Sequence, residues 1–103
     1  MISFLYSTFG TQKDAKKIAR QLLEERLVAC VNIIPNISSV YRWKGRIEEA
    51  EECVLIAKTI DKNIDRVIQK IKSLHPYEVP AIVVLPIIAG LQEYIDYVKD
   101  ELK

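Results

Sequence analysis

The stretch Val28-ACVNIIPNISSVYRWKGRIEEAEECVLIAK-Thr59 decides the fold of this chain. Its two long extended runs meet at Lys44-Gly45 and predict a β-hairpin. Val28 to Trp43 would rise by about 50 Å at about 3.3 Å per residue, whereas the helix expected before it spans only about 25 Å. We therefore expect the hairpin to extend beyond its own domain.

The tip of this hairpin carries Tyr41, Trp43 and Ile47 among charged residues. A two-stranded ribbon is at best marginally stable alone in water. We therefore expect other copies of the same chain to cover the tip.

The return strand begins with four glutamates, which are poor strand formers and repel one another. One interpretation is that cations of this chain or a neighbour face them, and the other is a solvated edge that discourages aggregation. The glutamates are Glu48, Glu49, Glu51 and Glu52, and the available cations are Arg42, Lys44 and Arg46.

The segment before the hairpin predicts a strand and a helix. Ile2–Phe9 has large apolar residues in both alternating sets, which indicates a strand buried on both faces. Gly10 ends this strand, and Thr11 with Asp14 predicts the start of a helix. Its apolar positions recur at helical spacing: Ala15, Ile18, Ala19, Leu22, Leu23 and Leu27.

Pro35 predicts a bulge in the first hairpin strand, because proline cannot donate to a strand ladder. We expect one alternating set of that strand to share a side: Ala29, Val31, Ile33, Pro35, Ile37, Tyr41 and Trp43. After the hairpin, Asp61 is predicted to cap a second helix that Pro76 ends. Val79–Leu85 predicts a last strand, and a third helix follows Gly90.

This order predicts an α+β, ferredoxin-like βαββαβ fold with an added C-terminal helix. Right-handed crossovers place both main helices on one sheet face, and the apolar residues left on the other face indicate an interface. A length of 103 residues, half of them apolar, suits a single domain spanning residues 1–103.

Composition argues against several classes of partner. A net charge of +1 without a basic run is not typical of nucleic-acid-binding proteins. No leader peptide or apolar run long enough to cross a bilayer is evident, so we expect a cytoplasmic protein without a membrane partner. Cys30 and Cys53 lie in apolar strand contexts and are expected to remain thiols.

Several segments resemble the CutA family of divalent-cation tolerance proteins: VACVNIIP at 28–35, VYRWKGRIEEAEE at 40–52, the strand end Ala57-Lys58-Thr59, and SLHPYEVPAIVVLP at 73–86. They occur in one collinear order over nearly the whole chain. The resemblance implies a PII-like homotrimer with interlocking hairpins and a cytoplasmic role linked to copper and other divalent ions.

The family's usual copper ligands are a thiol at the end of the first strand and two adjacent histidines before Pro-Tyr. The resemblance places Ser7, Leu74 and His75 at these positions, so only His75 keeps its donor and copper binding is expected to be weak. Imidazole and thiolate suit copper, which makes Cys30 a further candidate. The alternative is that His75 is structural, near the end of its helix.

A second candidate site is a cleft between subunits. Lys58, Tyr77 and His75 would form its floor, and Trp43 or Tyr41 would come from a neighbouring hairpin. An ammonium group, aromatic faces and a hydroxyl can orient a small carboxylate or phosphate. The alternative is an inter-subunit ion pair between Lys58 and Glu48 or Glu78.

Catalysis is not expected, because the three glycines stand apart and form no phosphate-binding loop, and no G-x-S-x-G motif occurs. The leading hypothesis is a trimeric divalent-cation tolerance protein that binds copper or other divalent ions weakly. The alternatives are a PII-like small-molecule sensor that uses the cleft and a structural assembly module.

Overall fold

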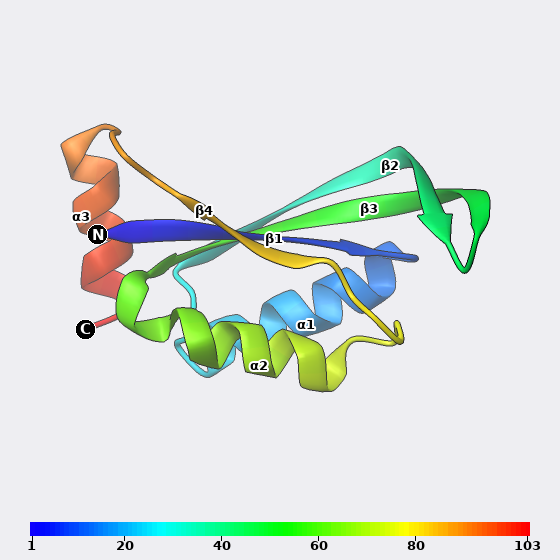
Figure 1. Cartoon of the computed structure of the whole chain (residues 1–103). Helices are drawn as coiled ribbons and strands as arrows, with labels where there is room; N and C mark the ends of the chain where they lie inside the picture. The colour runs from blue at the N-terminus through cyan, green and yellow to red at the C-terminus, as the bar shows by residue number, and fades with distance from the viewer.

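The computed structural model describes all residues 1–103. Its elements are β1 (Ile2–Phe9), α1 (Gln12–Glu24), β2 (Cys30–Trp43), β3 (Arg46–Ile60), the 3-10 turn η1 (Asp61–Asn63), α2 (Ile64–Leu74), β4 (Ile82–Pro86) and α3 (Gln92–Glu101). The antiparallel sheet has the strand order β2-β3-β1-β4, with α1 and α2 on one face and α3 at one end (Figure 1). This arrangement confirms the predicted ferredoxin-like fold.

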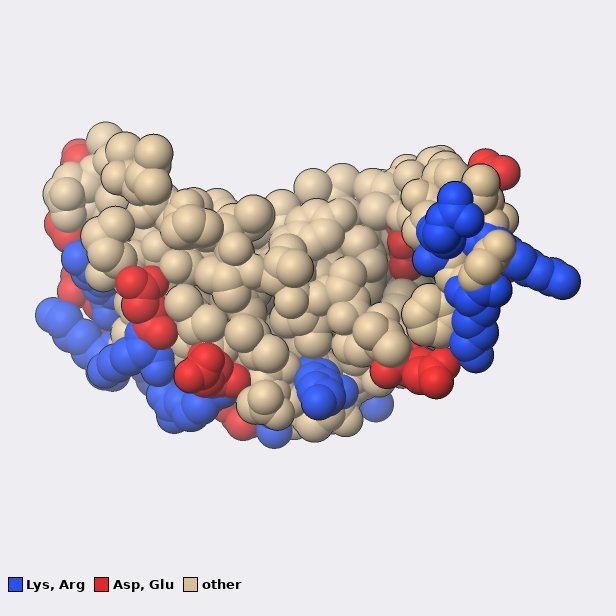
Figure 2. Space-filling model, in the orientation of Figure 1, with Lys and Arg blue, Asp and Glu red and all other residues tan.

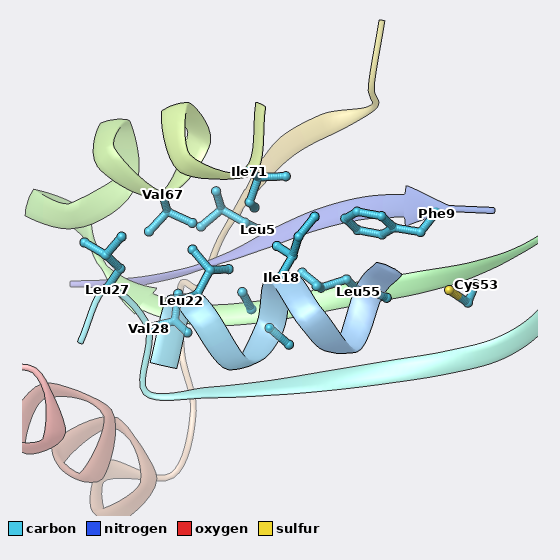
Figure 3. Packing of buried hydrophobic residues seen from close by; sticks show 13 residues of the cluster. Leu5, Phe9, Ile18, Leu22, Leu27, Val28, Cys53, Leu55, Val67 and Ile71 are labelled. Carbon is cyan, nitrogen blue, oxygen red and sulfur yellow. The ribbon is translucent and has the colours of Figure 1, made fainter. Parts of the chain in front are cut away.

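The main core lies between the sheet and the two long helices (Figure 3). α1 begins as predicted, since Thr11 Oγ1 accepts a hydrogen bond from the Asp14 backbone N–H at 3.2 Å. Both helices bury one apolar stripe against alternate residues of β1 and β3. The fully buried members include Leu5, Phe9, Ala15, Leu22, Leu55, Ala57, Val67 and Ile71.

The predicted bulge is present in β2, and it changes which residues share a face. Ile34 pairs with Val54 but Ile37 pairs with Glu52, so β2 contains one extra residue, and Asn36 has a φ of 57°. Residues before the bulge, such as Ile33, face the helices. Ile37 and the residues alternating after it face the opposite side, so the prediction of a single common side was wrong.

The hairpin extends beyond the rest of the sheet, as predicted (Figure 1). β1 pairs with β3 only as far as Phe9 and Cys53. Residues 37–52, here called the arm, have only each other as strand partners and do not fold over the helices. Their length contributes to overall extents of 44 × 26 × 22 Å.

The sheet face opposite α1 and α2, here called the open face, is only partly covered within one chain. The β1 side chains Phe4, Tyr6 and Thr8 lie there and are half-buried. Ile2 lies on the same face but is buried, because it packs in a second small cluster with Val98 and Leu102 at α3. In Figure 2 the charged side chains lie mainly along the helix side and at the arm, whereas the concave upper edge is mostly uncharged. The expected burial of β1 on both faces is therefore reached within one chain only at Ile2.

Two local predictions were wrong. Asp61 does not cap a helix, because its Oδ1 accepts a hydrogen bond from Ser3 Oγ at 2.9 Å while η1 leads into α2. β4 starts at Ile82 and not at Val79, and it pairs with β1 alone as an edge strand. No cation of this chain pairs with the arm glutamates, because its ion pairs are Lys70 with Glu25 and Lys103 with Asp100. Cations from a neighbouring copy and a solvated edge both stay predictions for these glutamates.

Candidate functional site

A hollow of about 630 Å³ lies on the open face where the arm leaves the sheet. β1, β2, β3 and the loop between α2 and β4 all contribute to its lining. The bulge in β2 is what directs Tyr41 and Trp43 to this face. The lining residues are Tyr6, Thr8, Ser39, Tyr41, Trp43, Glu52, Tyr77, Glu78, Val79 and Ala81.

Tyr77 and Glu52 are joined at the edge of this hollow. The Tyr77 hydroxyl donates a hydrogen bond to Glu52 Oε2 at 2.5 Å. Burial, together with the neighbouring Glu52 carboxylate, raises the pKa of Tyr77 well above its ordinary value. Tyr77 therefore stays a hydrogen-bond donor at neutral pH and holds the carboxylate in place.

His75 lies behind Tyr77, where it stacks on Phe9 with ring centroids 4.2 Å apart. Its Nε2 lies 2.8 Å from the Thr8 carbonyl oxygen, and its Nδ1 accepts the Tyr77 backbone N–H at 3.1 Å. A carbonyl can only accept and an amide N–H can only donate, so the ring is neutral with its proton on Nε2. Burial lowers the pKa of His75, which agrees with this state.

The proposed copper donors do not converge within one chain. Ser7 pairs with Leu55 on the helix face, and its buried Oγ has no hydrogen-bond partner. Cys30 pairs with Lys58, on the open face, and its Sγ lies 3.2 Å from the Tyr94 hydroxyl. No three His, Cys, Asp or Glu side chains of this chain are grouped to hold an ion.

Leu74, at the remaining ligand position, is the last residue of α2 and is 37% exposed. It offers no donor atom, and both ring nitrogens of its neighbour His75 are already hydrogen-bonded. The residues present therefore do not fit a three-donor copper site within one chain.

The predicted cleft residues are only partly brought together in one chain. Tyr77, Tyr41 and Trp43 line the hollow, whereas Lys58 and Glu48 do not. The Lys58 ammonium contacts Asn32 Oδ1 and lies 5.5 Å from the Phe4 ring centroid, far along β3. Glu48 pairs with Tyr41 in the arm. Neither Glu48 nor Glu78 forms an ion pair with Lys58 within this chain, and the alternative of such an ion pair between subunits stays a prediction.

Residues 3–101 match the family model described as CutA1 divalent ion tolerance protein. The chain is 44% identical over 93 residues to the divalent-cation tolerance protein CutA of Thermus thermophilus, and the match covers 90% of each chain. The chain belongs to the CutA1 divalent ion tolerance family. It is also 41% identical over 98 residues to human protein CutA, of which it spans 55% of the length.

Solved CutA structures agree with this CutA1 fold. A structure described as the periplasmic divalent cation tolerance protein CutA from Archaeoglobus fulgidus superimposes with a TM-score of 0.96 at 39% identity, over all of both chains. The divalent cation tolerance protein from Thermus thermophilus gives a TM-score of 0.95 at 41% identity, also over both whole chains. No helix of this chain is long and apolar enough to cross a membrane.

Sequence reasoning missed Tyr6 and Glu52 as parts of the hollow in this CutA1 chain. Tyr6 lies in the first strand and was interpreted as an ordinary apolar position. Glu52 was interpreted only as one of a run of glutamates. Strand alternation places Glu52 on the same side of β3 as Lys58 and Glu51 on the other side. What no local signal shows is which β2 residues share the face of Glu52, because the bulge in β2 sets that.

Proposed function

We propose that this protein acts as a cytoplasmic homotrimer that contributes to divalent-cation tolerance and binds copper or other divalent ions weakly. Membership of the CutA1 divalent ion tolerance family supports the link to divalent ions. One observation supports the assembly: the arm has no strand partner outside its own hairpin, and its own chain leaves large apolar side chains of the arm exposed. Both of its faces are apolar in part, with Val40 66% and Ile47 69% exposed on one face and Tyr41 45% exposed on the other.

Sedimentation of the purified protein tests the assembly. We expect a trimer at micromolar concentration, because a lone two-stranded ribbon with exposed apolar residues is unstable in water. A monomer under these conditions would contradict the proposal. A dimer would contradict the trimer but support cover of the arm by a second copy.

Metal binding is proposed as weak because the donors do not fit one site within a chain. Calorimetric titration of Cu²⁺ into the native protein should give weak binding, and His75→Gln should reduce its heat if the only imidazole takes part. Cys30→Ser tests in the same way whether the thiol takes part. A titration unchanged in both variants would exclude His75 and Cys30 as donors, and tight native binding would contradict the proposal.

The hollow supports a second candidate function, a PII-like sensor of a small molecule. Its volume of about 630 Å³ is within the range of small-ligand pockets, and its lining combines aromatic, apolar and acidic side chains. A thermal-shift screen with small ions tests this function. A shift with an organic ion but not with Cu²⁺ would favour the sensor over metal tolerance.

A further inference from the structure

The charged side chains that line the hollow within one chain are all acidic. Its lining contains Glu52 and Glu78 but no lysine, arginine or histidine. Lys58, the cation expected beside it, lies six residues from Glu52 on β3, about 20 Å away along an extended strand. The Lys44 ammonium lies 5.6 Å from the centroid of the Trp43 ring, but Lys44 is not among the lining residues. The lining itself therefore offers a cation two carboxylates and offers an anion no ammonium or guanidinium group.

The other main feature of the hollow is its aromatic content. Tyr6, Tyr41, Trp43 and Tyr77 come from three different parts of the chain and line one cavity. Aromatic rings carry negative charge on their faces and attract cations, with tryptophan the strongest. Organic cations with poorly hydrated charge gain most from such surroundings, whereas transition-metal ions prefer nitrogen and sulfur donors.

Part of the lining is held in place before any ligand arrives. The Tyr77 hydroxyl donates to Glu52 at 2.5 Å, and the Tyr77 ring packs against His75 with centroids 4.6 Å apart. Glu52 keeps further lone pairs to accept from a ligand. A carboxylate and an aromatic ring are thus positioned beside each other, which reduces the cost of ordering them on binding.

From these observations we propose that the hollow binds a small organic cation, of the alkylammonium or guanidinium class. The inference rests on the sensor function proposed above and names its class of ligand. Glu52 supplies the counter-charge, and Trp43 and Tyr41 supply aromatic faces from the arm. Val79 and Ala81 supply apolar contacts for the alkyl part.

Trp43 is the only tryptophan of the chain, so its fluorescence reports on the hollow directly. The native protein is titrated with choline, with its neutral isostere 3,3-dimethyl-1-butanol and with acetate. We expect choline to change the emission saturably and to bind at least about fivefold more tightly than the isostere, as a cation–π contact with a nearby carboxylate requires. Acetate should produce no saturable change.

Two matched variants locate the site. Glu52→Gln removes the charge with little change in shape and should weaken choline binding at least about fivefold. Glu49→Gln is the control, because Glu49 pairs with Val40 on the other face of the same arm and should leave binding unchanged. Circular dichroism and sedimentation of both variants check that the fold and assembly are retained.

The outcomes separate the ligand class from the sensor function. Equal binding of choline and its isostere, or equal effects of the two glutamine variants, would overturn the organic-cation proposal. Saturable acetate binding without choline binding would overturn the ligand class and leave the sensor function standing. No saturable change with any of the three probes, together with no shift in the thermal-shift screen, would overturn both the ligand class and the sensor function.

Discussion

His75 shows how the environment of one residue selects its role. The ring bridges the Thr8 carbonyl of β1 and the backbone N–H of Tyr77, and it also stacks on Phe9. These contacts tie the end of α2 to the central strand and support the loop that carries Tyr77 to the hollow. Sequence reasoning left metal binding and a structural role open for His75, and the hydrogen bonds of one chain match the structural role.

The lowered pKa of His75 predicts that stability depends on pH. The unfolded chain binds a proton near pH 6.5, whereas the folded chain resists it because burial lowers the pKa. The stabilisation is therefore complete above about pH 6.5 and is lost as the pH falls through the folded pKa, at up to about 1.4 kcal/mol per pH unit. Urea midpoints measured between pH 5.5 and 8 check this.

His75→Gln is the comparison for that measurement, because glutamine keeps a donor and an acceptor but does not titrate. His75 is the only histidine, so the variant should lose most of the pH dependence near pH 6. Its free energy of unfolding at pH 8 should fall by about 1–2 kcal/mol, since glutamine does not reproduce the hydrogen-bond geometry of the ring. An unchanged slope in the variant would assign the dependence to other groups.

At the scale of elements, the turn and the bulge shape the arm. Lys44 and Gly45 have φ values of 50° and 80°, as a two-residue type I′ turn between twisted strands requires. The bulge after Pro35 then turns alternate residues of β2 to the open face. Pro35 indicated this bulge from sequence, but its effect on the two faces depends on the pairing with β3.

Gly45→Ala should destabilise the hairpin by about 1 kcal/mol, because a side chain disfavours the positive φ at this position. Nothing lies within 4 Å of an added Cβ there, so the effect would be conformational and not steric. Gly90→Ala is the control, because its Cβ would make only ordinary contact with the Ile95 side chain at 3.6 Å. Urea unfolding measures both, and equal midpoints for the two variants would contradict the argument.

At the scale of the whole molecule, the arm and the open face are the parts that one chain leaves uncovered. The arm projects from one end of the sheet and α3 closes the other, which leaves a concave edge between them (Figures 1 and 2). The proposed homotrimer would bury these apolar surfaces. The hollow at the base of the arm would then lie close to a seam between subunits.

Ile47→Asp sharpens the sedimentation test of that assembly. A charge placed on the most exposed apolar position of the arm should weaken association about tenfold or more if a neighbour covers it, because an unpaired charge is costly to bury. Leu23→Asp is the control, since Leu23 is 41% exposed on α1, away from the arm. Equal association of both variants would place the contact elsewhere.

Much of the fold followed from local patterns in the sequence. Periodicity located α1 and the hairpin because side-chain spacing follows the backbone geometry of each element. Thr11 and Pro76 marked helix ends correctly, since capping and the missing proline N–H act within a few residues. Asp61 was assigned wrongly as a cap because a distant residue, Ser3, competes for its carboxylate.

The sequence by itself determined the order of the elements, the excess length of the arm and the family to which the chain is similar. Only the tertiary structure decided that Tyr41 and Trp43 join Tyr77 and Glu52 around one hollow, while Lys58 lies apart from it. The reason is physical: one extra residue in β2 shifts its register against β3 and reverses every later side chain. Such a shift is set by pairing between distant segments, which no local pattern records.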